Sequence, residues 1–169
     1  MAFYLMIPFA VHAAVMFVDE FHYHYERGLP RWERIGHPLD TLTILACFFW
    51  VLAKPVDSVN WKVYAVLAAV SCIFVTKDEW IHAEYCKGGE QWLHSLLFLF
   101  HPIVLLTTAV IWPFLHGQAL TWLILKEGQR HALKLAFTSF VAAATLYFFY
   151  QIFYWNLLWK KSTTPATTR

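Results

Sequence analysis

Apolar residues along the chain fall into five long runs, each bounded by charged residues and by proline or glycine. The runs predict helices at about 3–26, 32–53, 60–86, 89–115 and 128–160. Leu135–Trp159 contains no charged residue, and Trp92–Leu115 contains none apart from two histidines. About 20 apolar residues suffice for a helix to cross a bilayer. The pattern therefore predicts an all-α integral membrane protein with five transmembrane helices.

The predicted turns carry residues that end helices. The first three turns lie at Gly28–Pro30, at Lys54–Asn60 and at Gly88–Gly89, where proline or glycine interrupts the apolar pattern. Residues 116–127 form a longer connection of mixed polarity. Within it we expect a short helix at the membrane interface, around Ala119–Lys126.

The composition supports one membrane domain rather than a soluble fold. Of 169 residues, 59% are hydrophobic and 14% are charged, whereas soluble domains carry about 25% charged residues. We expect a single transmembrane domain over 1–161 and a disordered tail over 162–169. The first helix is expected to be retained, because its start lacks the basic residues and the cleavage site of a signal peptide.

Charge and cysteine content exclude two other classes of function. The net charge is +2 and the basic residues are dispersed, so a nucleic-acid partner is not expected. Cys47, Cys72 and Cys86 are an odd set without paired spacing, so neither a disulfide framework nor a thiolate metal site is expected.

The 13 basic residues also predict an orientation. Five helices place eight of them on the side of Arg27 and five on the side of Lys54. Since Lys and Arg are enriched in cytoplasmic loops, the N-terminus is predicted to lie outside. Nine of the 11 acidic residues fall in 19–40 and 78–90, at the same end as Arg27. Their site is therefore predicted near the cytoplasmic face.

Two predicted hairpins share one polar pattern, an acid followed four residues later by a histidine on each helix. The four pairs are Glu20 with His24, Glu33 with His37, Asp78 with His82, and Glu90 with His94. We interpret the pattern as an internal duplication, with repeat 1 at about 3–53, repeat 2 at about 60–115 and the helix at 128–160 outside it. Repeated membrane units often form their functional site where the repeats meet.

The spacing of these pairs predicts a metal site. Residues four apart on an α-helix project from one face, so the four pairs bring eight possible ligands into a pseudo-twofold four-helix bundle. Inward-facing Glu and His side chains hold two iron or manganese ions in such bundles. We therefore predict two divalent ions, with iron preferred over zinc or manganese. Asp19 with His22, or Glu79 with His82, offers a three-residue spacing, so the ligand set stays open.

The depth of the acids in the membrane also favours bound cations. The purely apolar part of the second helix, Leu42–Ala53, is too short to cross alone, so His37 and Asp40 must lie at or below the headgroups. A charged acid near the bilayer centre costs roughly 3 kcal/mol. A structural zinc site supplies on the order of 10 kcal/mol, enough to offset several such acids.

Three further polar residues flank the predicted ligands, and we predict catalytic or proton-transfer roles for Asp40, Glu79 and His101. Asp40 is about one helical turn from His37. His101 and His12 lie about two turns deeper than the ligand pairs. They are expected to line a pocket there or to hydrogen-bond to each other.

Several interpretations compete with this hypothesis. In the first, the acids need no metal and pair with histidines and with basic residues, namely Arg27, Arg31, Arg34 and Lys77. Among functions, we favour a metal-dependent membrane oxidoreductase acting on a lipid or quinone-like hydrophobic substrate. The alternatives are a zinc-dependent membrane hydrolase, a metal-ion or proton transporter, and a haem protein with His12 and His101 as axial ligands.

Overall fold

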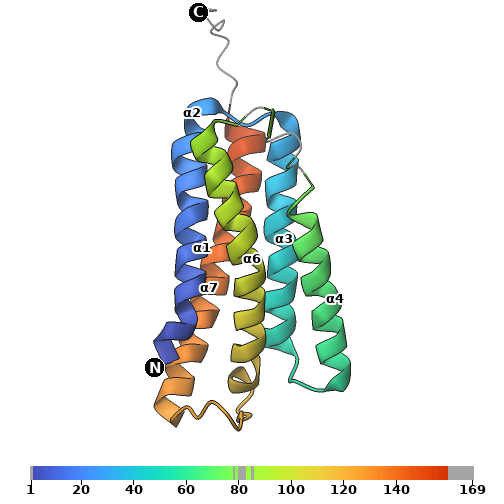
Figure 1. The fold of residues 1–169 in the computed structure, drawn as a ribbon, viewed down its shortest axis with the longest axis vertical. Helices are drawn as coiled ribbons and strands as arrows, with labels where there is room; N and C mark the ends of the chain where they lie inside the picture. The colour runs from blue at the N-terminus through green and yellow to red at the C-terminus, as the bar shows by residue number, and fades with distance from the viewer. Residues whose placement is uncertain (1, 78, 80–82, 85, 160–169) are drawn as a thin grey trace, which may run out of the picture.

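The computed structural model describes residues 2–77, 79, 83–84 and 86–159, which form a bundle of helices running up and down (Figure 1). The helices are η1 (Ala2–Met6), α1 (Ile7–Val18), η2 (Asp19–His24), α2 (Tyr25–Arg27), α3 (Arg31–Ala53), α4 (Ser58–Phe74), α6 (Gly88–Leu115), α7 (Glu127–Phe153) and η3 (Tyr154–Leu158). Segment η1 is a 3-10 helix, and η2 and η3 are π-helices. The described residues contain no strand, which confirms the all-α prediction.

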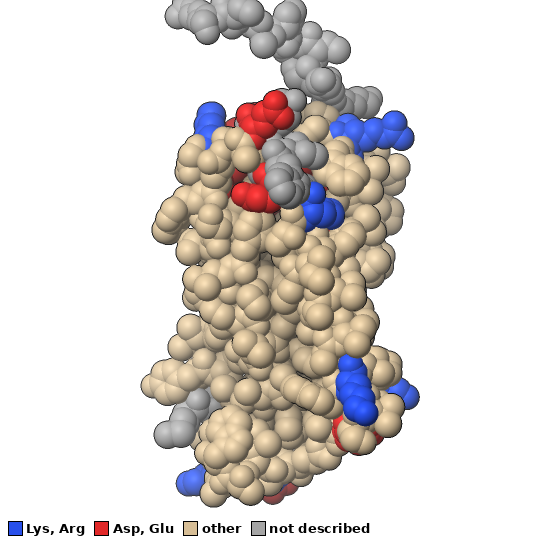
Figure 2. Space-filling view, turned by 45° about the vertical axis from the view of Figure 1, so that its right-hand side comes forward, with Lys and Arg blue, Asp and Glu red and all other residues tan. Residues whose placement is uncertain are grey.

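Four helical stretches are long and apolar enough to cross a membrane. They are Phe3–His24, Arg31–Ala53, Gly88–Leu115 and Glu127–Leu158. On the face drawn in Figure 2, acidic and basic side chains gather at the two ends of the bundle and leave an apolar belt between them. This distribution is consistent with an integral membrane protein.

The third predicted helix is shorter than the sequence pattern indicated. We expected it to run over 60–86, but α4 ends at Phe74 and is 17 residues long, about 26 Å at 1.5 Å per residue, against a hydrocarbon core of about 30 Å. The Thr76 hydroxyl donates to the Ile73 carbonyl at 2.8 Å, and such a local bond competes with helix propagation. Four of the five predicted spans are therefore long and apolar enough to cross a membrane, and α4 falls short of spanning length.

The connection between α6 and α7 also differs from the prediction. The helix expected around Ala119–Lys126 is not formed, and Leu120 and Leu123 pair instead in an isolated β-bridge. Gly117, at φ +73°, turns the chain after α6, and leucines of this segment then pack against the hydrophobic core. Burying leucines on both sides of a tight turn is incompatible with the single apolar face of a helix.

A tight turn joins α2 to α3 at the upper end in Figure 1. Gly28 has φ +71°, and a Cβ atom at this position would lie 2.6 Å from the Trp159 ring, so only glycine fits there. Pro30 immediately precedes α3 in an extended conformation. The turn therefore holds the last residues of the first span beside the first turn of α3.

The interior of the bundle changes character along its length. In the lower half, Phe9, Phe48 and Phe137 are at most 1% exposed, and their ring centroids are 5.7–6.1 Å apart. Helices α1, α3 and α7 supply one of these rings each. At the upper end, the interior is lined instead by histidines and carboxylates from η2, α3 and α6.

Candidate metal centre

A π-helical segment at the upper end of the first span sets the geometry of the site. Asp19, Glu20 and His24, all in η2, are buried. Asp19 and His24 are five residues apart and would lie about 140° apart around an α-helix. In a π-helix, hydrogen bonds join residues five apart, so these two side chains lie one above the other. The local departure from α-helical geometry therefore turns Asp19 and His24 into the same interior.

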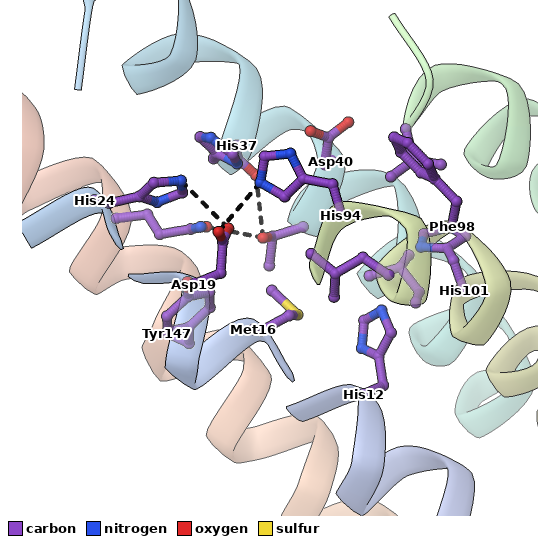
Figure 3. Close-up of a pocket in the computed structure, with 15 residues that line it drawn as sticks. His12, Met16, Asp19, His24, His37, Asp40, His94, Phe98, His101 and Tyr147 are labelled. Carbon is purple, nitrogen blue, oxygen red and sulfur yellow. Dashed lines mark hydrogen bonds and ion pairs between the residues drawn. The ribbon is translucent and has the colours of Figure 1, made fainter. Parts of the chain in front are cut away.

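Four buried side chains converge there, from η2 and from the start of α6. Asp19, His24, Glu90 and His94 each offer one ligand atom, and these atoms all lie within 4.8 Å of one another. Asp19 Oδ1 is 3.1 Å from His94 Nε2, and Asp19 Oδ2 is 3.3 Å from His24 Nε2 (Figure 3). Donors bound to one cation at about 2.1 Å in a tetrahedron lie about 3.4 Å apart. The four-residue set thus has nearly the spacing that a divalent cation requires.

A second group of possible ligands adjoins this set. His24, Glu33 and His37 also place ligand atoms within 4.8 Å of one another. The rings of His24 and His37 have centroids 4.8 Å apart, and Glu33 is fully buried. Because His24 belongs to both groups, the two groups form one continuous polar layer across η2, α3 and α6.

Glu20 holds His24 in the orientation that a metal ligand needs. Glu20 Oε2 lies 3.3 Å from His24 Nδ1, a contact in which the carboxylate oxygen accepts from the ring N–H. Among the described residues, His24 Nε2 is buried and meets no hydrogen-bond criterion. It faces Asp19 Oδ2 at 3.3 Å and Glu90 Oε1 at 3.9 Å. A carboxylate on the distal nitrogen is the usual support of a metal-binding histidine.

Helix α7 and the π-helix η3 fix Glu20 in turn. Trp155 Nε1 donates to Glu20 Oε1 at 2.5 Å, and the Tyr147 hydroxyl donates to Oε2 at 3.4 Å. Three groups therefore contact this carboxylate. The geometry places Glu20 beside the four-residue set, as a support for His24, although the sequence spacing suggested a direct ligand.

The remaining predicted residues have different surroundings. Asp40 lies on the wall of the site and forms an ion pair of 2.7 Å with Lys77. Glu79 is exposed. Asp78 and His82, predicted as ligands, lie outside the described residues. The structure thus brings together six of the eight predicted ligands, together with Asp19: Glu20, His24, Glu33, His37, Glu90 and His94.

Arg31, Arg34 and Lys77 are among the possible basic partners of these acids. Arg34 donates to the Trp155 carbonyl at 3.4 Å and stacks over the Trp159 ring at 5.2 Å. Arg31 is exposed, and Lys77 pairs with Asp40. Asp19 and Glu20 contact histidines.

A cavity of about 70 Å³ opens beneath the polar layer. Asp19, His24 and His94 line its upper wall, and His12 and His101 line its lower wall (Figure 3). The volume exceeds the ~30 Å³ that one water molecule occupies in the liquid. Ligand atoms of the four-residue set therefore face a space that can hold solvent or a small polar group.

One of the deeper histidines, His101, belongs to a separate hydrogen-bonded chain. His101 Nε2 lies 2.9 Å from the Ser71 hydroxyl, which lies 3.0 Å from the Thr43 hydroxyl. The rings of His12 and His101 have centroids 5.9 Å apart. The expectation that both histidines line a pocket is met, and no direct hydrogen bond between them is found in the described residues.

Three residues of the site were not predicted as functional, and Asp19 was predicted only as an alternative ligand paired with His22. Its pairing with His24 depends on π-helical geometry. Tyr147, Gln151 and Trp155 follow one another at intervals of four on α7 and η3, so they share a helical face. Gln151 accepts from the Thr41 hydroxyl at 2.8 Å, and both line the cavity. This spacing was the available signal, but their aromatic neighbours suggested a membrane-interface belt.

Comparison with known proteins yields no match to a family model, to a curated protein or to a solved structure. The geometry of the polar layer and its cavity is therefore the basis for assigning a function.

Proposed function

We propose that the protein is an integral membrane metalloenzyme, with its metal centre formed by Asp19, His24, Glu90 and His94. One observation supports this most directly. Four buried residues, two histidines and two acids, place ligand atoms within 4.8 Å of one another, and three of them, Asp19, His24 and His94, line a cavity. Burial of two carboxylates inside a helical bundle is costly unless positive charge compensates them.

A divalent cation would supply this compensation. His24 Nε2 and His94 Nε2 both face Asp19, at 3.3 and 3.1 Å. Glu20 contacts the other ring nitrogen of His24, and a carboxylate in this position is the usual support of a metal-binding histidine. The donor chemistry of the site therefore fits a resident cation.

Glu33 and His37 extend the proposal to a second ion. They occupy the same positions in the first hairpin that Glu90 and His94 occupy in the second, an acid and a histidine four apart near the start of a helix. Facing Glu and His pairs are the arrangement by which helical bundles hold two ions. We therefore propose a dinuclear centre that lies where two repeated hairpins meet.

The activity that fits this centre best is oxidation of a hydrophobic substrate. A pair of iron ions bound by histidines and carboxylates supplies oxygen activation, and manganese or zinc are the next candidates. The residues of the chain hold the substrate and transfer protons. Asp40, fixed by Lys77 on the cavity wall, is placed to accept a proton there, and the buried setting excludes bulk water.

The charge distribution supports an orientation for this proposal. The polar layer lies at the end of the bundle where α3 begins with Arg31 and Arg34 and where Lys77 pairs with Asp40. By the positive-inside rule, the metal centre lies near the cytoplasmic face, and the N-terminus lies outside.

Metal analysis of detergent-purified protein tests the proposal. We expect at least one divalent ion per chain in the native protein and its loss when His24→Ala and His94→Ala are combined, because two of four ligands disappear. His22→Ala is the matched control, since this exposed histidine lies in the same segment and pairs with Glu26 at the surface. Sub-stoichiometric metal that is unchanged in the double variant would exclude the metal centre.

The same preparation separates the competing functions. An ultraviolet charge-transfer band identifies oxo-bridged iron and supports the oxidoreductase. A featureless spectrum with bound zinc favours a hydrolase, in which metal-bound water is the nucleophile. A Soret band identifies haem. Movement of the bound ion across liposome membranes would replace the enzyme with a transporter.

A further inference from the structure

A second pocket adjoins the cavity at the metal centre and has a volume of about 290 Å³. The two spaces share walls from α1, α3 and α7, formed by His12, Met16, Thr41, Ile44 and Tyr147. Every polar residue that lines the second pocket is among these five. Its polarity is therefore confined to the end that meets the cavity.

The rest of the second pocket is apolar and reaches the surface of the bundle. Its outer walls are Ala13 and Phe17 from α1 and Phe140, Ala143 and Ala144 from α7. Ala13, Phe17 and Ala143 are exposed, so the pocket opens between α1 and α7. Both helices are among the four of spanning length, and the opening therefore faces the hydrocarbon region of a membrane.

Small side chains create this pocket. Ala13, Ala143 and Ala144 leave space between α1 and α7 that larger side chains would fill. Phe17 and Phe140 border that space with aromatic surface. The volume is close to the lower limit of typical small-molecule pockets, about 300 Å³. One flexible chain fits such a space better than a broad ring system or two chains.

We propose that this pocket, called the alkyl pocket, binds the aliphatic chain of a single-chain lipid substrate, with its polar end in the cavity beside the metal centre. The inference rests on the proposed function and names its substrate class. The occupant must be amphiphilic, because the wall changes from alanine and phenylalanine to His12, Thr41 and Tyr147 along one path. The aliphatic chain of a lipid enters this pocket from the bilayer without crossing water, so the free-energy cost of its transfer is small.

His12 marks the boundary between the two spaces. It is 6% exposed and lines both of them. In Figure 3 its ring lies across the open space from Asp19, beside Met16 and His101. A hydroxyl or carbonyl head group held near His12 would therefore have the metal ligands on its other side.

Photolabelling in lipid nanodiscs tests the alkyl pocket. The probe is a long-chain alcohol with a diazirine midway along its chain, and labelled residues are located by mass spectrometry. We expect labels concentrated on Phe17, Phe140 and their neighbours. Ala143→Phe fills the opening and should reduce this labelling about tenfold or more. An overpacking cost of about 1.4 kcal/mol corresponds to this tenfold change in occupancy.

Ala142→Phe is the matched control, because Ala142 is exposed on the same helix and does not line the pocket. It should leave labelling unchanged. Equal labelling of all membrane-facing helices, or equal loss in both variants, overturns the alkyl pocket.

Metal content measured on the same samples separates the two proposals. A metal-free native protein overturns the proposed function, whatever the labelling shows. A metal-loaded protein with unselective labelling overturns the alkyl pocket alone. Circular dichroism confirms that each variant retains its helices.

Discussion

Two pairs of buried histidines occupy the same bundle, and their surroundings differ. The upper pair, His24 and His94, contacts both oxygens of Asp19. In the lower pair, His101 lies 2.9 Å from the Ser71 hydroxyl, and its ring centroid is 5.9 Å from that of His12. Hydroxyl groups satisfy a neutral imidazole but bring no negative charge. Carboxylates bring charge that must be compensated inside an apolar bundle.

The comparison shows why histidine alone is a weak indicator of a metal site. Both pairs are buried and both line the same cavity. The upper histidines lie among acids, whose negative charge attracts a cation, so we propose the metal centre there. The lower pair is better suited to hydrogen-bond a neutral head group. The following three experiments contrast the two layers.

The largest effect is expected from Asp19→Asn. Asp19 is the residue that contacts both upper histidines, and the amide removes its negative charge while keeping its shape. Metal affinity should fall by more than about a hundredfold, the upper limit for losing a supporting residue. Competition with a chelator measures this affinity.

Glu26→Gln is the control for Asp19→Asn. Glu26 lies at the same end of the bundle, but its side chain is 66% exposed. The metal affinity of Glu26→Gln should match that of the native protein. Equal metal binding by Asp19→Asn and the native protein would remove Asp19 from the ligand set.

An intermediate effect is expected from Glu20→Gln. Glu20 supports His24 from behind and is itself held by Trp155. The amide no longer fixes the proton on His24 Nδ1, so metal affinity should fall about ten- to a hundredfold. Trp155→Phe, which removes the donor to Glu20, should produce a smaller loss in the same titration. A total loss of metal in Glu20→Gln would make Glu20 a direct ligand after all.

The smallest effect is expected from Ser71→Ala in the lower layer. The variant removes the hydrogen bonds to His101 and Thr43, and the free energy of unfolding should fall by about 1 kcal/mol. Metal content should not change. Unfolding in mixed detergent micelles measures the first quantity and elemental analysis the second. Metal loss in Ser71→Ala would mean that the two layers form one site.

The sequence was sufficient to predict the helices and the end of the bundle at which the acids gather. Apolar length predicted four spans, because crossing a bilayer requires a fixed number of residues. It overestimated α4, since the polar run after Phe74 forms a turn whose local hydrogen bonds compete with a helix. It also predicted a helix near Ala119–Lys126, where leucines pack inward from a turn.

The candidate site was predictable where α-helical periodicity holds. Glu33 with His37, and Glu90 with His94, are four apart on regular helices and converge as that spacing indicates. Asp19 was not assigned as a ligand in its pairing with His24, because α-helical geometry separates the two by about 140°. A π-helix depends on tertiary packing that apolar periodicity does not reveal.

The contribution of the last helix was also hidden from the sequence. Trp155 and Tyr147 lie among other aromatic residues, and composition alone suggests a membrane-interface belt. Their hydrogen bonds to Glu20 depend on how α7 and η3 pack against the first span. Long-range contacts of this kind require the fold.

The π-helical segment also bears on how such a site is inherited. A turn of π-helix contains one more residue than the α-helical turn that it replaces, so η2 is a single codon away from an ordinary helix. Deleting one codon between Asp19 and His24 would leave these two residues four apart, a spacing that also places them on one face of an α-helix. A chain with the acid and histidine four apart, as in α3 and α6, can therefore differ from this one by a single inserted triplet.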